Sequence, residues 1–196
     1  IMGRGPDDED SEFARREARL FVRELGKLKG TYIKIGQMLA LFGEQLLPRV
    51  LVDALRELSD QTEPLHWDAL ESSVRDSLGT RYQELDIDPQ AIAAASLAQV
   101  HLARIRASGD WICLKIQYPG LAQVIDADFD AVVRMLLLAR WVKTGRELDD
   151  WLESMRAHLH NEIDYRREAA FTKRMGVLVK NVRATVVSYH VPQLYP

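Results

Sequence analysis

The stretch that decides the fold is Trp111–Tyr118, with the sequence WICLKIQY, because its side chains alternate in character. Alternation with a period of two predicts a β-strand whose hydrophobic side chains share one face. That face holds Ile112, Leu114, Ile116 and Tyr118. Lys115 falls on the other face, with Trp111 and Cys113. A lysine at mid-strand either prevents edge-to-edge association of sheets or holds an anionic group as a point charge.

The segments around this strand predict a small antiparallel sheet. Gln99–Arg106 is a second strand-like run, and the turn-forming residues 107–110 (ASGD) join the two strands as a hairpin. Thr185–Tyr195 is rich in β-branched residues and predicts a final strand. Asp86–His101, before the hairpin, lacks helical periodicity.

Helices are expected before and after the hairpin, because hydrophobic residues recur there every three or four positions. The predicted ranges are Glu12 onward, 30–43, Pro48–Gln61, Trp67–Leu78, Leu121–Lys143 and Glu147–Lys180, the last with a break near Gly176. Residues 1–10 are polar and are expected to be loosely held. Helices followed by a small antiparallel sheet with further helices predict an α+β fold.

The composition limits the class of protein. The chain has 196 residues, 47% of them hydrophobic, which suits one globular domain or one domain with an appendage. Its net charge of -3 argues against a nucleic-acid partner, since such proteins carry a basic excess. The one cysteine, Cys113, excludes an internal disulfide and is interpreted as a packing residue. Because the sequence starts at Ile1 and stops at Pro196 after a strand-like run, we expect a fragment cut at both ends.

The first predicted helix carries two stripes. The hydrophobic stripe consists of Ala14, Ala18, Phe21, Leu25, Leu28 and Tyr32. The opposite stripe is basic and consists of Arg16, Arg19, Arg23 and Lys27. This basic stripe is either an ordinary solvated face or the face of an amphipathic helix that rests on anionic lipid. Both interpretations stay open at the level of the sequence.

The stretch NEIDYRREA, residues 161–169, supplies carboxylates at helical spacing. Asp164 and Glu168 are four positions apart and share a helix face, whereas Glu162 points elsewhere. Glu168 is a candidate partner for Lys115, and Glu162 and Asp164 are candidate partners for Lys34. The plain alternative is a solvated helix stabilised by Glu–Arg pairs.

The second predicted helix, GTYIKIGQMLA at residues 30–40, places a lysine and a glutamine in an apolar run. Lys34 and Gln37 share one helix face. A lysine in apolar surroundings needs a carboxylate, here Glu162 or Asp164, or it must face a wet cleft. A glycine at position 36 lets the helix approach a neighbour closely.

These motifs, in this order, resemble those of the ABC1/ADCK/UbiB family of atypical kinase-like proteins, most of all its bacterial AarF-type members. The resemblance runs from about Leu25 to the C-terminal end. The family has a K-x-G-Q motif, an alanine-rich loop in place of a glycine-rich one, a lysine on the third strand, and an E-x-D motif before a helical glutamate. The matching residues are Lys34, Gly36 and Gln37; Ala93, Ala94, Ala95 and Ser96; Lys115; Glu162 and Asp164; and Glu168. For the alanine-rich loop, a simple helical turn is the alternative.

The resemblance implies a protein-kinase-like N-lobe at residues 86–196 and an N-terminal helical extension at residues 1–85. It implies that Lys115 and Glu168 are catalytic, that the alanine-rich loop and Lys115 bind ATP or ADP with Mg²⁺, and that the K-x-G-Q and E-x-D residues occlude the substrate side. It also implies ATPase or small-molecule phosphoryl chemistry in ubiquinone or isoprenoid-lipid metabolism. The expected setting is cytoplasmic and peripheral at the inner membrane, with a quinone or isoprenoid lipid and the membrane surface as partners.

One departure from the family limits these expectations. No C-lobe catalytic loop and no D-F-G motif follow Glu168, so the C-lobe, with the catalytic base and the Mg²⁺ ligands, is absent from this sequence. The chain alone is not expected to turn over substrate. The alternative is a non-catalytic lipid- or protein-binding module on a pseudokinase scaffold. His158, His160 and Glu162 form an H-x-H-x-E pattern, in which His158 and Glu162 are four positions apart on a helix. A metal site is not predicted, because no third ligand accompanies these two.

Overall fold

Helices form most of the molecule, and a three-stranded sheet lies in the middle of the described sequence. The computed structural model describes residues 11–58, 63–142, 144–180 and 188–195. The α-helices are α1 (Glu12–Leu28), α2 (Thr31–Phe42), α3 (Arg49–Leu55), α4 (Glu71–Leu78), α5 (Leu121–Leu138), α6 (Arg146–Ile163) and α7 (Tyr165–Lys180). The strands are β1 (Leu85–Ala94), β2 (Ala98–Ile105) and β3 (Trp111–Gln117), and short 3₁₀ turns occupy Trp67–Ala69 and Gly79–Glu84.

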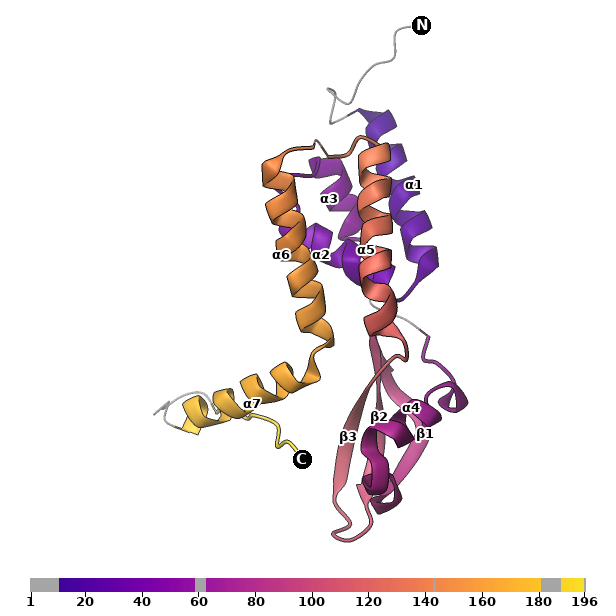
Figure 1. Cartoon of the computed structure of the whole chain (residues 1–196), viewed down its shortest axis with the longest axis vertical. Helices are drawn as coiled ribbons and strands as arrows, with labels where there is room; N and C mark the ends of the chain where they lie inside the picture. Colours follow the sequence, from indigo (N-terminus) through magenta and orange to yellow (C-terminus); the bar gives the residue numbers. More distant parts are fainter. Residues whose placement is uncertain (1–10, 59–62, 143, 181–187, 196) are drawn as a thin grey trace, which may run out of the picture.

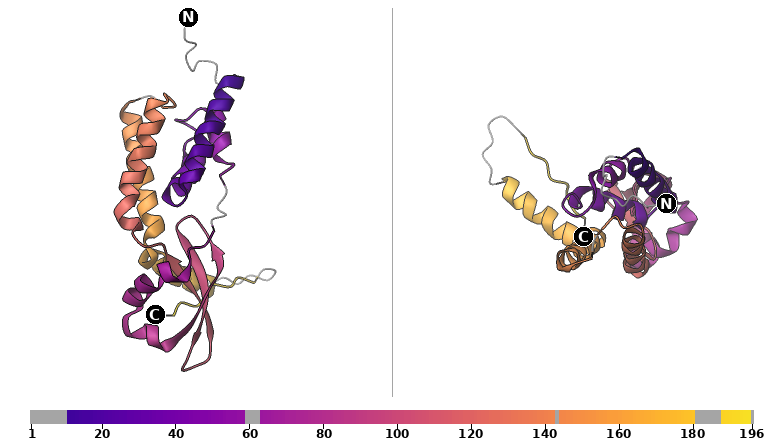
Figure 2. Two further views of the ribbon diagram at one scale, coloured as in Figure 1. Left: turned by 90° about the vertical axis from the view of Figure 1, so that its right-hand side faces the viewer. Right: turned by 90° about the horizontal axis from the view of Figure 1, so that it is seen from above.

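Helices α1, α2, α3, α5 and α6 share one hydrophobic core at the upper end of the molecule in Figure 1. Its fully buried members include Leu25 of α1, Leu51 of α3, Phe129 of α5 and Leu159 of α6. Turned by 90°, the molecule shows α5 and α6 on one side of this core and α1 on the other (Figure 2). Ser11 caps the start of α1, because its side chain accepts a hydrogen bond from the Ala14 backbone N–H at 3.1 Å.

Outside this core, ion pairs between charged side chains join α5 to α6. Arg156 of α6 donates to Asp126 at 2.6 Å and to Asp130 at 2.5 Å, both on α5. His160 lies 3.0 Å from the same Asp126 carboxylate. Hydrogen bonds from Arg156 and His160 hold the pKa of Asp126 below its usual value. These contacts fix the direction of α6, which leads to the site described below.

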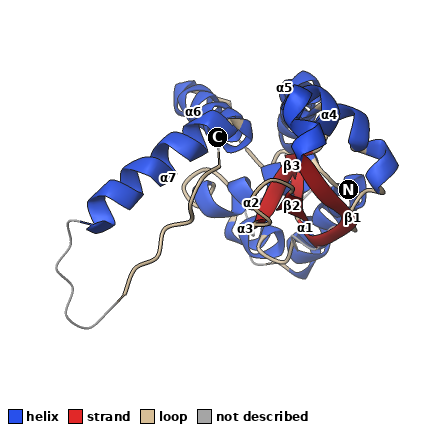
Figure 3. Ribbon diagram, turned by 90° about the horizontal axis from the view of Figure 1, so that it is seen from below, coloured by secondary structure: helices blue, strands red, loops and turns tan. Residues whose placement is uncertain are grey.

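The sheet has a smaller core of its own. Its strands are antiparallel in the order β1-β2-β3, and one face packs on α4 (Figure 3). The buried members of this cluster are Ile116 of β3, Val74 of α4 and Leu70, which directly precedes α4. Since neighbouring side chains along a strand point to opposite faces, Lys115 lies on the face away from α4.

The α+β fold and the antiparallel hairpin are confirmed, one strand was not predicted, and two details of the prediction are wrong. Leu85–Ala94 is a strand that pairs with β2, although Pro89 and its polar neighbours hide the alternation. Residues 188–195 of the predicted final strand form neither strand nor helix, while residues 185–187 lie outside the described part of the chain. The long C-terminal helix breaks at Asp164, and α7 runs past Gly176 to Lys180.

Candidate functional site

Lys115 and Glu168 meet on the open side of the sheet. Lys115 comes from β3, and its Nζ lies 2.7 Å from Oε2 of Glu168 on α7. The two side chains are 48% and 53% exposed, so the pair can be reached from solvent. The contact predicted between them is present. The sheet therefore presents a cation that is held in place by a carboxylate and is still accessible.

Tyr165, at the start of α7, completes the surroundings of Lys115. The Lys115 ammonium lies 4.6 Å from the centre of the Tyr165 ring, within the range of a cation–π contact. Burial raises the pKa of Tyr165 to about 12, and the negative charges of Glu168 and Glu162 act in the same direction. The phenol is thus neutral at physiological pH and offers the ammonium the face of its ring.

The elbow between α6 and α7 holds this arrangement together. Asp164 Oδ1 accepts hydrogen bonds from the backbone N–H groups of Arg166 at 3.0 Å and Arg167 at 3.1 Å, which caps the start of α7. Gln117 of β3 donates from Nε2 to the Ile163 carbonyl at 2.9 Å. The elbow is therefore capped from within and attached to the strand that carries Lys115.

Sequence reasoning missed Gln117 and Tyr165. Gln117 follows Lys115 by two positions on a strand, so alternation alone places both side chains on one face. Tyr165 stands inside the motif that contains Asp164 and Glu168, but nothing in the sequence states which way an aromatic side chain beside a helix break will turn.

Lys34 forms the second ion pair of the region, with Glu162 at 2.8 Å. Its side chain is 22% exposed, so it is neither fully buried nor directed into bulk solvent. Of the two carboxylates considered for Lys34, Glu162 is its partner, because Asp164 caps α7 instead. The pair lies in a groove of about 460 Å³ between α2 and α6, whose lining also includes Gln37, Met38, Leu41, Phe42 and His158.

Gly36 lies where α2 packs against its neighbours. A Cβ atom at this position would come within 2.4 Å of Leu58 Cδ1 and 3.0 Å of Leu25 Cδ2. The close approach predicted from the K-x-G-Q glycine is therefore present. Lys34 and Gln37 then lie on the side of the helix that faces the groove.

Ala93 and Ala94 are the last residues of β1, and Ala95 and Ser96 lie in the turn between β1 and β2. The alanine-rich residues therefore do not form a helical turn. The Ala95 N–H donates to the Ala98 carbonyl at 2.8 Å, and Ser96 is almost fully buried. Ala93 pairs with Val100, which in turn pairs with Lys115. Ala93 and Lys115 are thus in register two strands apart, roughly 10 Å at the usual strand spacing.

The described residues contain no group of three or more His, Cys, Asp or Glu side chains that could hold a metal ion. In the H-x-H-x-E pattern, His158 stacks on Phe42 and Glu162 pairs with Lys34. The interpretation of Cys113 as a packing residue is wrong, because its side chain is exposed on the same face as Lys115. Among the helices of the described residues, none is long and apolar enough to cross a membrane.

A small antiparallel sheet whose third strand carries a lysine, paired with a glutamate on a following helix, is the arrangement of a protein-kinase-like N-lobe. The family model described as "ABC1 atypical kinase-like domain" matches residues 57–196. The chain belongs to this family. The family predicted from the motifs is thereby confirmed.

The chain is similar to several curated proteins. It is 33% identical over 185 residues to "Atypical kinase COQ8, mitochondrial" of Schizosaccharomyces pombe, covering 92% of this chain and 30% of that protein. It is 32% identical over 177 residues to the protein of that name from Saccharomyces cerevisiae, covering 88% of this chain and 34% of the yeast protein. It is 35% identical over 169 residues to "Probable protein kinase UbiB" of Vibrio atlanticus, covering 83% of this chain and 30% of that protein.

The chain thus spans about a third of the length of these relatives. Fungal and bacterial relatives match at similar identity, so the expected preference for bacterial members is not supported.

Proposed function

We propose that this chain forms the nucleotide-binding part of an atypical kinase of the ABC1 family. The observation that supports this most directly is the 2.7 Å contact between Lys115 and Glu168 on the open face of the sheet. In kinase-like proteins the corresponding pair must be in place for phosphoryl transfer. Bound ATP would supply the phosphoryl group, and the residues of this chain would hold and orient it.

The geometry suits a phosphate group. A lysine ammonium has three donors, and Glu168 accepts one of them. The cation–π contact with the Tyr165 ring stabilises the Lys115 ammonium and leaves its positive charge in place. Lys115 can therefore stay paired with Glu168 while its remaining N–H groups point to phosphate oxygens.

The alanine-rich turn would cover the nucleotide. Ala93, Ala94, Ala95 and Ser96 are the proposed covering residues. Alanine disfavours positive φ and keeps the backbone farther from a ligand than glycine does, so this turn would be stiffer than a glycine-rich loop. Its register with Lys115 through Val100 supports the assignment.

The occluding role of the K-x-G-Q and E-x-D residues is also part of the proposal. Lys34, Gly36 and Gln37 on α2, with Glu162 and Asp164 at the elbow, would close the side from which a large substrate would enter. The Lys34–Glu162 contact supports this, because it joins α2 to the helix that leads into the lysine site. A small-molecule phosphoryl acceptor or ATP hydrolysis would then be favoured over a protein acceptor.

Further elements of the proposal rest on the family. Mg²⁺ would accompany the nucleotide, with ligands outside this chain. Relatives bearing the names COQ8 and UbiB support an atypical kinase in ubiquinone or isoprenoid-lipid metabolism. We also propose an extension at residues 1–85, an N-lobe at 86–196, and a cytoplasmic setting at the periphery of the inner membrane.

Titration calorimetry of the chain with ATP tests the nucleotide role. Replacing Lys115 by Met should weaken binding by about tenfold or more, because a hydrogen bond to a charged group contributes about 1.5–3 kcal/mol. Lys173→Met on the exposed face of α7 is the matched control and should bind as the unmodified chain does. Equal affinity in both variants would contradict the phosphate role of Lys115.

The same titration addresses the alternative function. A non-catalytic binding module on a pseudokinase scaffold would keep the Lys115–Glu168 pair for stability alone. It would show no ATP binding in the unmodified chain, and Lys115→Met would then affect only the free energy of unfolding.

A further inference from the structure

Two polar side chains of β2 are buried on the face of the sheet that packs on α4. Gln99 is 1% exposed and His101 is 0% exposed. His101 pairs in register with Leu114, and its ring lies against that of Trp67, with the ring centres 5.0 Å apart. Polar groups at this depth cost free energy unless each of them is hydrogen-bonded, so the partners of the two side chains matter.

Gln99 binds the backbone of Leu65 through its side-chain amide. The amide Oε1 accepts a hydrogen bond from the Leu65 N–H at 2.8 Å, and Nε2 donates to the Leu65 carbonyl at 3.1 Å. Leu65 lies in the segment 63–66, which is exposed and is neither helix nor strand. Gln99 therefore holds an irregular segment to the sheet much as a neighbouring strand would be held.

His101 connects Gln99 to β1. Its Nδ1 lies 2.8 Å from the Asp88 carbonyl, and because a carbonyl can only accept, Nδ1 carries the proton and donates it. Its Nε2 is then the acceptor for the second N–H of the Gln99 amide, at 2.8 Å. Both ring nitrogens of His101 and both amide N–H groups of Gln99 are thus used within one network.

The network lies where β1 needs support. The register between β1 and β2 shifts between Ile87 and Ala91, so the regular backbone pairing is interrupted there. At this interruption the His101 side chain supplies the hydrogen bond to β1. Beyond it, β1 runs into the alanine-rich turn, and Ala94 at the start of that turn is paired with Gln99. The course of β1 into the turn is therefore held from the buried side of the sheet.

We propose that Gln99 and His101 are positioning residues that hold the alanine-rich turn in place over Lys115, an inference that rests on the function proposed for that turn. Val100, between them, pairs with Lys115 and lies on the open face, so Gln99 and His101 point to the opposite face. They act through the strand and not by contact with the nucleotide. Loss of their hydrogen bonds would let β1 and the turn shift relative to Lys115.

Titration calorimetry with ATP tests this role. Gln99→Met keeps a long unbranched side chain but removes its hydrogen bonds. It should weaken ATP binding by about fivefold or more, the lower end of typical coupling between two sites. His101→Leu should act in the same direction. His101→Asn keeps a donor for the Asp88 carbonyl and should bind ATP more tightly than His101→Leu does.

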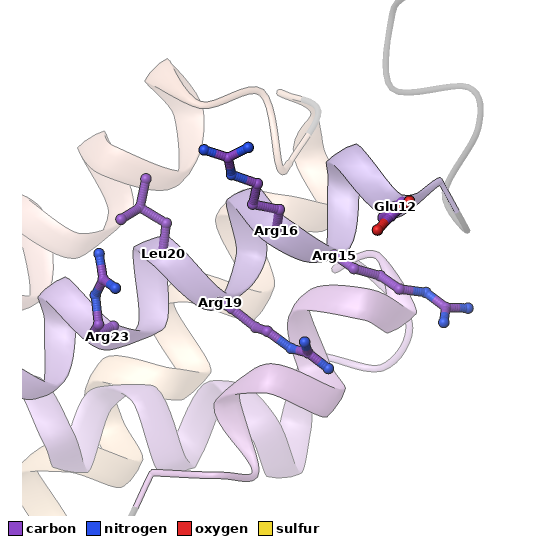
Figure 4. A pocket seen from close by; sticks show the side chains of 6 residues that line it. All are labelled: Glu12, Arg15, Arg16, Arg19, Leu20 and Arg23. Atoms are coloured by element: carbon purple, nitrogen blue, oxygen red, sulfur yellow. The ribbon is translucent and has the colours of Figure 1, made fainter.

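Val74→Ala is the matched control for a loss of stability alone. Val74 is 5% exposed in the hydrophobic cluster of the sheet, and its apolar side chain has no hydrogen bond to contribute to the network. The change should lower the free energy of unfolding in urea without weakening ATP binding. Arg16→Ala is the surface control, because its side chain extends from the outer face of α1 (Figure 4), and it should change neither quantity. If Gln99→Met and Val74→Ala have the same ATP affinity, the network serves stability only and the positioning role is wrong.

Nuclear magnetic resonance of the chain without ATP separates this role from nucleotide binding. Gln99→Met should shift the amide resonances of residues 93–96, and Val74→Ala should move them much less. If the unmodified chain binds no ATP, the proposed function fails, while these resonances still test whether the network positions the turn. Unchanged resonances in Gln99→Met would overturn the positioning role.

A variant of the exposed segment replaces Gln99→Met if circular dichroism shows that Gln99→Met is unfolded. Leu65→Pro removes the backbone N–H that donates to Gln99 without altering a buried side chain. It should weaken ATP binding and shift the resonances of residues 93–96 in the same direction. No change in either measurement would contradict the role of Gln99.

Discussion

Gly36 shows how a single methyl group can matter in the helical core. Gly36→Ala would place Cβ 2.4 Å from Leu58 and 3.0 Å from Leu25, which is itself buried. Crowding of this kind costs about 1–3 kcal/mol, while alanine regains about 1 kcal/mol of helix propensity. We expect a net loss of about 1 kcal/mol in the free energy of unfolding, measured by urea denaturation.

Gly26→Ala is the matched control for Gly36. Its added Cβ would lie 3.5 Å from Leu58, an ordinary contact. Alanine should therefore keep or raise stability there, by up to about 1 kcal/mol. If the two variants have the same free energy of unfolding, the close packing of α2 does not require a glycine at position 36.

Tyr165 is expected to make the stability of the folded chain depend on pH in the alkaline range. Burial raises the pKa of Tyr165 from 10.0 to about 12. The unfolded chain therefore loses this proton at lower pH than the folded chain does. The stability contributed by the neutral phenol is complete below pH 10 and is lost as pH rises towards 12.

Tyr165→Phe should remove part of this alkaline loss. The urea midpoint of the variant should fall less steeply than that of the unmodified chain between pH 10 and 12. Identical slopes in the two proteins would show that the Tyr165 hydroxyl is not buried at the elbow.

At the scale of elements, the start of α7 depends on one side chain. Asp164 accepts hydrogen bonds from two backbone N–H groups, and loss of such a cap costs about 0.5–2 kcal/mol. Asp164→Ala should speed hydrogen exchange in the first turn of α7 and loosen the Lys115–Glu168 contact. Asp164→Asn retains an acceptor and should behave much like the unmodified chain. Equal exchange in the alanine and asparagine variants would argue against the cap.

Asp164 also shows why the break between α6 and α7 could not be predicted from the sequence. The spacing of Asp164 and Glu168 predicts a shared face on one continuous helix, and the pairing of Glu168 with Lys115 follows from motif identity. The helix instead breaks at Asp164, because a short carboxylate there satisfies the N–H groups of a new helix. An aspartate that caps a new helix and an aspartate inside a continuous helix have the same spacing to their neighbours in the sequence. The spacing alone therefore could not reveal the break at Asp164.

Strand β1 was missed for a different reason. Residues 85–94 include Asp86, Asp88 and Pro89, and the strand is irregular where its pairing with β2 shifts. The strand forms because it pairs with β2, and its own sequence has no regular alternation of polar and apolar residues that would predict it. The hairpin of β2 and β3, by contrast, was predictable because burial on the α4 face imposes a clear alternation on β3.

At the scale of the whole molecule, the two hydrophobic clusters predict that the helical core and the sheet with α4 can open separately. The helical core and the sheet with α4 have separate buried members. Leu70→Ala in the smaller cluster removes a fully buried side chain, at a cost of about 2–5 kcal/mol. Hydrogen exchange should rise in β2 and β3 and stay unchanged in α1 and α5.

Leu136→Ala, in the helical core, is the counterpart and should show the reverse pattern. If either change raises exchange equally in both regions, the two clusters unfold as one cooperative unit. Contacts that link the two regions, such as the hydrogen bond from Gln117 to the Ile163 carbonyl, would then be strong enough to couple their unfolding.

The exposed thiol of Cys113 makes the lysine site open to chemical labelling. Cys113 precedes Lys115 by two strand positions on the same face, so the two side chains start roughly 7 Å apart. Since the chain has no other cysteine, a thiol-reactive fluorophore would attach at this one position without any substitution. The protein thus carries its own attachment point for an environment-sensitive reporter, and the same thiol would let an acrylamide group anchor an inhibitor beside the lysine.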